Sequence, residues 1–199
     1  MKRPAAAAGE TWRCFIGVPI GEELRGQLAS FVERLRRPPA AAALRWSEPS
    51  GWHVTLAFLG PITPSTIGTL KKGLRPVAAA QRPFSVTSAG LGAFPSPRDM
   101  RVLWYGVDDP SGELGALAAA VSACAGLPPQ GVFRAHLTLA RSKDSGRGTV
   151  AMGTVAADAG EPPRGTIRVD RIELYRSHLS RGPAEYEVLA SLPLARPGR

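Results

Sequence analysis

The amino-acid sequence predicts an α+β fold in which one strand–helix–strand unit occurs twice. Short apolar runs alternate with segments of helical periodicity, and each of the two units ends in a strand with the pattern His-x-Thr-Leu. A chain of 199 residues suits one domain or two closely fused lobes, and it can bury a substantial core. We therefore expect an internal duplication.

Strands are expected where short apolar runs lie between turn-forming residues. The first run, WRCFIGV, ends at Pro19, and a turn around Pro95 and Pro97 joins the fourth strand to the fifth. A loop with Gly182 and Pro183 joins the last two strands. The expected strands are residues 12–18, 44–47, 52–59, 84–91, 101–107, 133–141, 165–176 and 184–194.

Helices are expected where apolar side chains recur every three to four residues. The first places Leu24, Leu28 and Phe31 on one face, with acidic residues at its start and arginines at its end, as the helix dipole favours. Pro38 ends this helix because proline lacks the backbone N–H. The expected helices are residues 22–35, 64–80 and 111–125, with a short helical stretch at 149–157.

The composition indicates a globular protein, since 44% of the residues are apolar and no apolar run approaches the roughly 20 residues needed to cross a bilayer. Gly9 and Glu10 precede any long hydrophobic region, so we expect no signal peptide. Cys14 and Cys124 are expected to be free thiols in a cytoplasmic protein. We expect residues 1–10 to be a disordered extension and residues 11–199 to form a single bilobal domain.

The net charge is compatible with a polyanionic partner. The chain has 25 Lys and Arg against 16 Asp and Glu, a formal charge of +9, and nearly all of the excess is arginine. The guanidinium group offers a planar fork to phosphate oxygens. A GC-rich genome would produce the same Ala, Gly, Pro and Arg bias without any RNA partner, so charge alone leaves both explanations open.

The repeated tetrapeptide is HVTL at residues 53–56 and HLTL at residues 136–139. Because side chains alternate along a strand, His53 and Thr55 share one face while Val54 can enter the core. His136 and Thr138 have the same relation. Two of the three histidines in the chain lie in this pattern. A lone histidine in a strand is usually structural, but two in matching positions indicate one shared site.

Histidine and threonine suit the hydrolysis of a cyclic phosphodiester. The reaction needs a base that deprotonates water and an acid that protonates the leaving ribose oxygen, and histidine can fill either role near neutral pH. Threonine hydroxyls can donate to the non-bridging phosphate oxygens. No carboxylate or cysteine is spaced to complete a metal site with His53 or His136, so we expect catalysis without a metal or another cofactor.

Several segments of the chain resemble the bacterial and archaeal RNA 2′,3′-cyclic phosphodiesterases, the 2′-5′ RNA ligase-like group of two-histidine phosphoesterases. Ala135 departs from that pattern, which often has proline before the second histidine. The resemblance extends over nearly the whole chain and is carried by FIGVP (15–19), RW (45–46), HVTLAFLG (53–60), GLGAFP (90–95), RVLW (101–104), HLTLAR (136–141), ELYRS (173–177) and GPAEY (182–186).

The resemblance implies a bilobal fold with two pseudo-symmetric antiparallel sheets around a central cleft and helices outside. It implies hydrolysis of RNA 2′,3′-cyclic phosphate ends, or of a cyclic nucleotide, to a 2′-phosphate. His53 would be the proton donor and His136 the proton acceptor, while Thr55, Thr138 and Arg141 would bind the phosphate. We expect a monomer that does not bind a membrane.

Other side chains are candidates for the nucleotide. Arg141 lies five residues after His136, so it reaches the site only if the strand twists or ends near Ala140. Arg45 and Arg101 could either line the groove or be solvated at the surface, and the sequence does not decide between these two positions. The aromatic candidates for stacking on a base are Phe15, Trp46 and Tyr186.

Core packing is favoured over stacking for Phe15, and more clearly so for Phe58 and Trp104. His178 lacks a threonine partner and is expected in a surface loop.

Two other functions remain open. The cleft would bind RNA or a nucleotide without turnover if the histidines only contacted phosphate, although binding alone does not need two acid–base residues. The reverse reaction, 2′-5′ ligation, needs a 5′-hydroxyl partner for which the sequence offers no evident site.

Overall fold

The computed structural model describes residues 9–129, 131–143, 151–178 and 184–195. Its strands are β1 (Trp12–Pro19), β2 (Leu44–Trp46), β3 (His53–Ile62), β4 (Phe84–Pro95), β5 (Met100–Asp108), β6 (His136–Ser142), β7 (Thr166–Val169), β8 (Arg171–His178) and β9 (Glu185–Pro193). Its helices are α1 (Glu22–Leu35), α2 (Pro64–Ala80), α3 (Glu113–Cys124) and α4 (Met152–Ala156), with 3₁₀ turns at Pro39–Ala43 and Pro49–Gly51.

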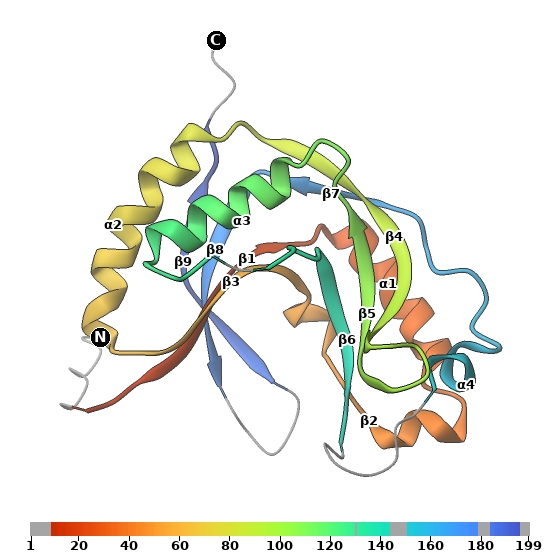
Figure 1. The fold of residues 1–199 in the computed structure, drawn as a ribbon. Coiled ribbons are helices and arrows are strands. Elements are labelled where there is room, and N and C mark those ends of the chain that lie inside the picture. The colour runs from red at the N-terminus through yellow and green to blue at the C-terminus, as the bar shows by residue number, and fades with distance from the viewer. Residues whose placement is uncertain (1–8, 130, 144–150, 179–183, 196–199) are drawn as a thin grey trace.

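The strands form one curled sheet with two related halves (Figure 1). Strands β9, β8, β1 and β3 form the His53 half, and β6, β5, β4 and β7 form the His136 half, with β2 paired to β6. Every pair is antiparallel. The halves meet at the single register pair Val54–Leu137, and β3 and β6 then diverge. The predicted α+β fold with two halves is confirmed, and the two sheets are continuous through this pair.

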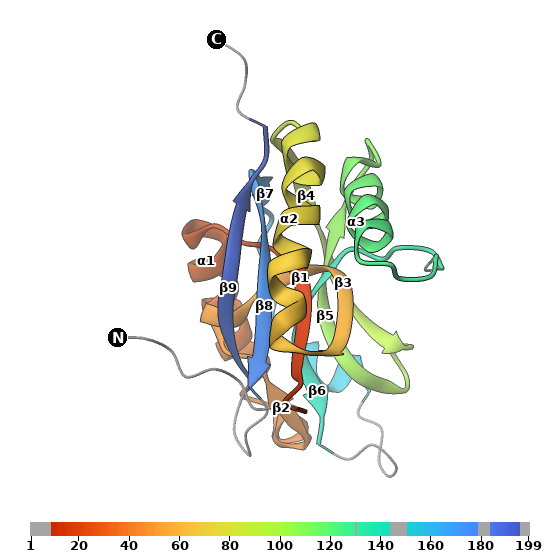
Figure 2. The same ribbon diagram turned by 90° about the vertical axis from the view of Figure 1, so that its left-hand side faces the viewer.

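Helices α1 and α3 each follow a strand of one half and contact the other half. The β1–α1 connection leaves the His53 half, yet Arg34 of α1 donates to the Ala159 carbonyl at 2.8 Å and Leu24 packs beside Gly165, which precedes β7. Helix α3 follows β5 of the His136 half and packs on β3 and α2. Figure 2 shows α1 and α3 on opposite sides of the sheet. Helices α1 and α3 therefore each contact the other half of the molecule, which ties the two together.

The helix predictions for 22–35 and 64–80 match α1 and α2, because both carry a continuous apolar face. The single strand expected at 165–176 is wrong. The chain leaves β7 at the edge of the His136 half and enters β8 in the His53 half, so the segment breaks at Asp170. The strand expected at 84–91 continues to Pro95, because its pairing with β5 runs on to Met100. His178 ends β8 instead of lying in a loop.

No helix in the described ranges is long and apolar enough to cross a membrane. Cys14 is buried and Cys124 is partly exposed, and both are free thiols. Of the expected N-terminal extension, residues 1–8 lie outside the described residues, while the Glu10 carboxylate accepts a hydrogen bond from Trp12 Nε1 at 2.7 Å. The loop expected at Gly182 and Pro183 also lies outside them.

Candidate active site

The two histidines begin the two strands that meet between the halves. His53 is the first residue of β3 and His136 the first of β6. Val54 and Leu137, one position further along, are 1% and 0% exposed, while the threonines two positions along remain partly exposed. The predicted alternation is confirmed, since each histidine shares a face with its own threonine.

Both imidazoles are held by the same local hydrogen bond. His53 Nδ1 lies 2.7 Å from the Gly51 carbonyl, and His136 Nδ1 lies 2.7 Å from the Arg134 carbonyl. Because a carbonyl oxygen only accepts, Nδ1 is the donor in each ring. The neutral rings therefore carry their lone pair on Nε2, which is the atom left to exchange a proton with a ligand.

A β-bulge lies at the last residue of each tetrapeptide, and in β6 it brings Arg141 to the site. In the β5–β6 pairing, Trp104 lies opposite Thr138 and Leu103 opposite Ala140, so Leu139 is the extra residue. Leu139 and Ala140 are consecutive buried residues, and Arg141 returns to the face of His136. Regular alternation would have placed it on the other face. Leu56 is the matching bulge in β3.

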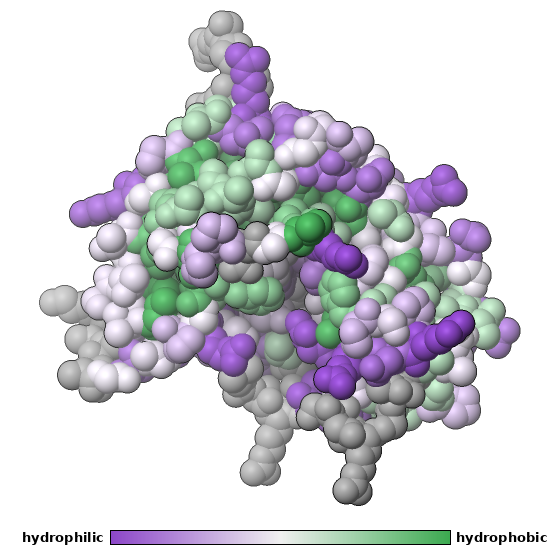
Figure 3. Space-filling view, viewed as in Figure 1, coloured by the Kyte–Doolittle hydropathy of each residue, from purple (hydrophilic) through white to green (hydrophobic). Residues whose placement is uncertain are grey.

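A cavity of about 680 Å³ lies between the two halves. The space-filling view shows the surface hollowed there, with hydrophilic residues along the rim (Figure 3). His136 is not a lining residue, but it lies two residues before Thr138, and its charge acts on His53. The lining includes Phe15, His53, Thr55, Thr138, Arg141 and Tyr186.

The lining is basic. Arg13, Arg45 and Arg141 contribute to it, and no Asp or Glu is among the described residues that line it. Arg45 is paired in register with Arg141, which places both arginines on one wall. Arg101, the other arginine left open from the sequence, is exposed and does not line the cavity. An anionic ligand is therefore favoured over a cationic one.

The aromatic surroundings of the two histidines differ. Phe15 and Tyr175 stack on His53 at centroid distances of 4.4 and 5.3 Å, and Tyr186 meets its ring edge-on at 5.2 Å. Among the described residues, the ring contacts of His136 are with Phe94, edge-on at 5.1 Å, and with Trp104, tilted at 6.1 Å. His53 is therefore enclosed on more sides.

Burial lowers the pKa of both imidazoles. The His53 pKa falls from 6.5 to about 4, mainly through desolvation, while the hydrogen bond to Gly51 acts in the opposite direction. Desolvation also lowers the His136 pKa, and the Arg141 guanidinium lowers it further. Both rings are thus neutral near pH 7 in the unliganded protein.

The aromatic candidates take different positions. Phe15 is 4% exposed and packs among other rings, whereas Tyr186 is partly exposed and packs against His53. Trp46 lines the cavity, donates Nε1–H to the Ala41 carbonyl at 3.3 Å and lies beneath the Arg36 guanidinium.

The sequence predicted Phe58 and Trp104 in the core, but neither side chain is buried there. Phe58 is 64% exposed and lines the cavity, because the bulge at Leu56 turns it toward the site. Trp104 is partly exposed and packs against His136. The spacing signal for Phe58 was present, since it follows His53 by five residues as Arg141 follows His136.

Two histidines on equivalent strands beside a basic cavity define the class of site, that of a two-histidine phosphoesterase. The family model of LigT-like phosphoesterases matches residues 18–104 and 106–184. The chain belongs to this family.

Relatives and solved structures agree with this assignment. An RNA 2′,3′-cyclic phosphodiesterase of Methanothermobacter thermautotrophicus is 28% identical over 170 residues, 84% of this chain and 91% of the relative. One from Aquifex aeolicus is 36% identical over 144 residues, 69% of this chain and 74% of the relative. The crystal structure of E. coli LigT complexed with phosphate is similar with a TM-score of 0.71, at 25% identity, over 94% of this chain and 100% of that one.

Proposed function

We propose that this protein hydrolyses RNA 2′,3′-cyclic phosphodiester ends to 2′-phosphates. The observation that carries the proposal is the matched pair of histidines, each oriented by the same Nδ1 hydrogen bond and each followed by a threonine on its own face. Curated relatives named RNA 2′,3′-cyclic phosphodiesterase support the same activity. The substrate would be an RNA end or a free cyclic nucleotide.

The chemistry is an in-line displacement at phosphorus. The oxygen of a water molecule attacks the phosphorus as one imidazole Nε2 takes its proton, and the bond between phosphorus and O3′ breaks. The second imidazole, protonated on Nε2, delivers its proton to O3′. The ribose keeps the phosphate on O2′, and one proton has passed from water to the leaving oxygen.

In our proposal His53 is the proton donor and His136 the acceptor, as in the family. The acceptor role suits a neutral imidazole with a free Nε2 lone pair. The donor role requires a protonated His53, although its pKa is about 4 in the unliganded protein. An anionic phosphodiester beside the ring raises that pKa, so substrate binding would load the proton that the reaction uses.

The phosphate would be held by Thr55, Thr138 and Arg141. The first two offer hydroxyl donors from opposite walls, and the guanidinium offers a charged fork that becomes stronger as negative charge develops on the oxygens. Phe15, Trp46 and Tyr186 are the proposed contacts for the nucleoside. Phe58 joins them, since it is the most exposed of these rings.

The test is product analysis on an oligonucleotide with a 2′,3′-cyclic end, in EDTA. We expect a 2′-phosphate product, and we expect His53→Ala and His136→Ala each to reduce kcat by roughly 10²- to 10⁴-fold. His178→Ala is the matched control, since this third histidine pairs with Glu187 at 3.1 Å and does not line the cavity. Full activity in both site variants would refute the proposal.

The same assay separates the two alternatives. Tight binding of the cyclic end without product would indicate a binding module without turnover. Joined 2′-5′ product from a cyclic end and a 5′-hydroxyl RNA would indicate ligation. A monomeric state and a cytoplasmic location stay predictions.

A further inference from the structure

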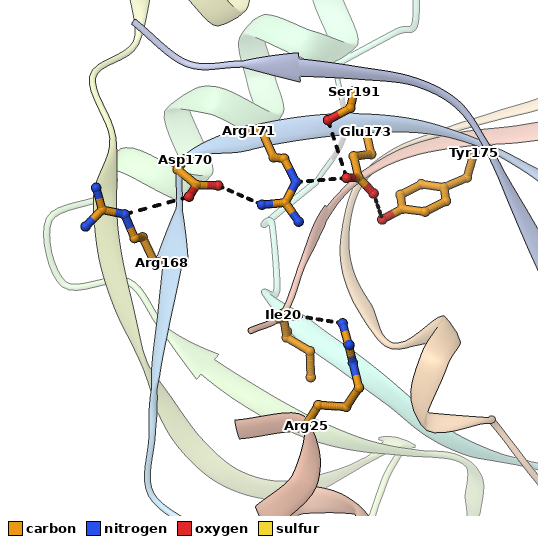
Figure 4. Close-up of polar contacts among 8 residues, drawn as sticks. All are labelled: Ile20, Arg25, Arg168, Asp170, Arg171, Glu173, Tyr175 and Ser191. Atoms are coloured by element: carbon orange, nitrogen blue, oxygen red, sulfur yellow. Dashed lines mark hydrogen bonds and ion pairs between the residues drawn. The ribbon is translucent and has the colours of Figure 1, made fainter. Parts of the chain in front are cut away.

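A buried carboxylate lies two strands away from His53. Glu173 of β8 is 8% exposed and sits opposite Gly17 of β1, which in turn sits opposite Thr55 of β3. Its carboxylate accepts hydrogen bonds from Tyr175 Oη at 2.6 Å, Arg171 Nε at 2.9 Å and Ser191 Oγ at 3.4 Å. Figure 4 shows these three side chains pointing at the carboxylate. The proposed hydrolysis does not use this network.

The network orients the Tyr175 ring, and that ring contacts His53. Tyr175 stacks on Phe15 at 4.8 Å with 14° between the planes, and on His53 at 5.3 Å with 29°. Gly17 supplies the space, because a Cβ there would lie 2.9 Å from the Val54 carbonyl oxygen and 3.2 Å from His53 Cδ2. The hydrogen bond between Nδ1 and the Gly51 carbonyl holds one edge of the His53 imidazole in place. The stacked rings of Phe15 and Tyr175 restrict the tilt of the imidazole.

Within the part of the chain that the structure describes, the His136 half has no such network. By register, the position equivalent to Glu173 is Gly92, and the position equivalent to Tyr175 is Phe94, which has no hydroxyl. The ring of Phe94 meets His136 edge-on and does not stack. A general requirement of the fold would place a carboxylate in both halves, so the Glu173 network is specific to His53.

We propose that Glu173 and Tyr175 are positioning residues for His53. The carboxylate holds the tyrosine hydroxyl, and the tyrosine ring, together with Phe15, holds the imidazole at the angle from which Nε2 meets the substrate. This inference rests on the proposed function for its effect on rate, but the orientation of the ring is open to direct measurement without substrate.

The charges around His53 give a second readout. Glu173 raises the His53 pKa from β8, while His136 and Arg141 lower it from β6. Tyr175 and Tyr186 have raised pKa values through burial and stay neutral near pH 7. Removing the Glu173 charge should therefore lower the His53 pKa further, because only the two lowering charges remain.

The test uses Tyr175→Leu, Tyr175→Phe and Glu173→Gln in the full chain. Ring protons of His53, assigned by comparison with His53→Gln, are followed by NMR without substrate. In Tyr175→Leu we expect them to shift while those of His136 stay, because the ring current of one stacked partner is lost. We expect kcat to fall about tenfold with KM within about twofold, since a small misplacement of a reacting group has effects of this size.

The conservative variants are expected to change less. Tyr175→Phe keeps the ring but loses the hydrogen bond to Glu173, so we expect smaller shifts of the His53 ring protons than in Tyr175→Leu and a kcat lowered by about threefold. Glu173→Gln should lower the His53 pKa in an NMR titration. Tyr105→Phe is the matched control, since this buried tyrosine donates to the Pro163 carbonyl in the other half.

Unchanged His53 resonances and kcat in Tyr175→Leu would overturn the proposal, as would equal shifts at His53 and His136. A wild-type protein without activity would count against the proposed function only, because the resonances would still report the orientation of the ring. A folded Tyr175→Leu protein, judged by its thermal unfolding, is required for either result. If it does not fold, Tyr175→Phe decides, and unchanged His53 ring resonances in that variant overturn the proposal.

Discussion

The two halves of the sheet present equivalent strands to the cavity but fill equivalent positions differently. Histidine, threonine and the bulged leucine are the same in β3 and β6. The neighbouring strand has Gly17 in the His53 half and Trp104 in the His136 half, each paired with its threonine. The next strand has the small and large residues reversed, with Glu173 against Gly92.

The comparison distinguishes the positions that the proposed reaction requires in both halves from the positions that make the surroundings of His53 and His136 different. In the proposed mechanism the shared positions hold the acid–base residues and the phosphate donors, which would act on one phosphorus from two sides. The unlike positions surround each imidazole with different rings and charges. A duplicated scaffold can therefore supply two copies of one residue and lower the pKa of each through different surroundings.

The largest difference between the halves should appear at the fifth position after each histidine, which is Phe58 in one and Arg141 in the other. Arg141→Gln should lower kcat/KM roughly 10²- to 10³-fold, because the guanidinium stabilises charge that develops on the phosphate. Phe58→Leu should instead raise KM a few-fold by removing a surface for the base. Steady-state kinetics on a cyclic-ended dinucleotide measures both.

Arg101→Gln is the control, since this exposed arginine lies beside Val102, the register partner of Arg141, but outside the cavity. Equal losses in Arg141→Gln and Arg101→Gln would mean that general charge, not a phosphate contact, explains the effect.

The shared positions predict matching losses. Thr55→Val and Thr138→Val should each lower kcat by roughly ten- to a hundredfold, because each removes one neutral donor to the phosphate. The two losses should agree within about threefold if the halves hold the phosphate symmetrically. A loss confined to one variant would show that only one wall contacts the phosphate. Thr87→Val, on β4 and exposed, controls for the loss of a hydroxyl elsewhere.

The smallest expected effect concerns stability against pH. The pKa of His53 is 6.5 in the unfolded chain and about 4 in the folded protein, so the unfolded chain binds more protons between these pH values. This contribution to stability is complete above pH 6.5 and is lost as the pH falls toward about 4. Urea unfolding at pH 4.5 and 7.5 should show the wild type losing on the order of 2 kcal/mol more than His53→Gln.

The same comparison for His136→Gln should give a smaller difference, because its ring is enclosed by fewer neighbours. A pH dependence that is identical in the wild type and both variants would mean that neither imidazole is desolvated in the folded protein.

Local patterns predicted most of the fold and the centre of the site. The bounds of α1 and α2 followed from apolar periodicity and from proline at their ends, and the faces of His53 and Thr55 followed from alternation. The break at Asp170 was missed because one segment supplies both β7, at the edge of the His136 half, and β8, between β1 and β9 in the His53 half. The orientation of Arg141 was uncertain because a bulge depends on the partner strand.

By itself, the sequence identified the two histidines that we propose as acid and base, because the repeated tetrapeptide and the two-residue period of a strand depend only on neighbours along the chain. Tertiary structure alone decided how each histidine is surrounded. Glu173 and Tyr175 lie about 120 residues from His53, and they reach it only through the pairing of β8 with β1 and of β1 with β3. Burial, ring stacking and pKa are properties of such long-range contacts, which no local pattern encodes.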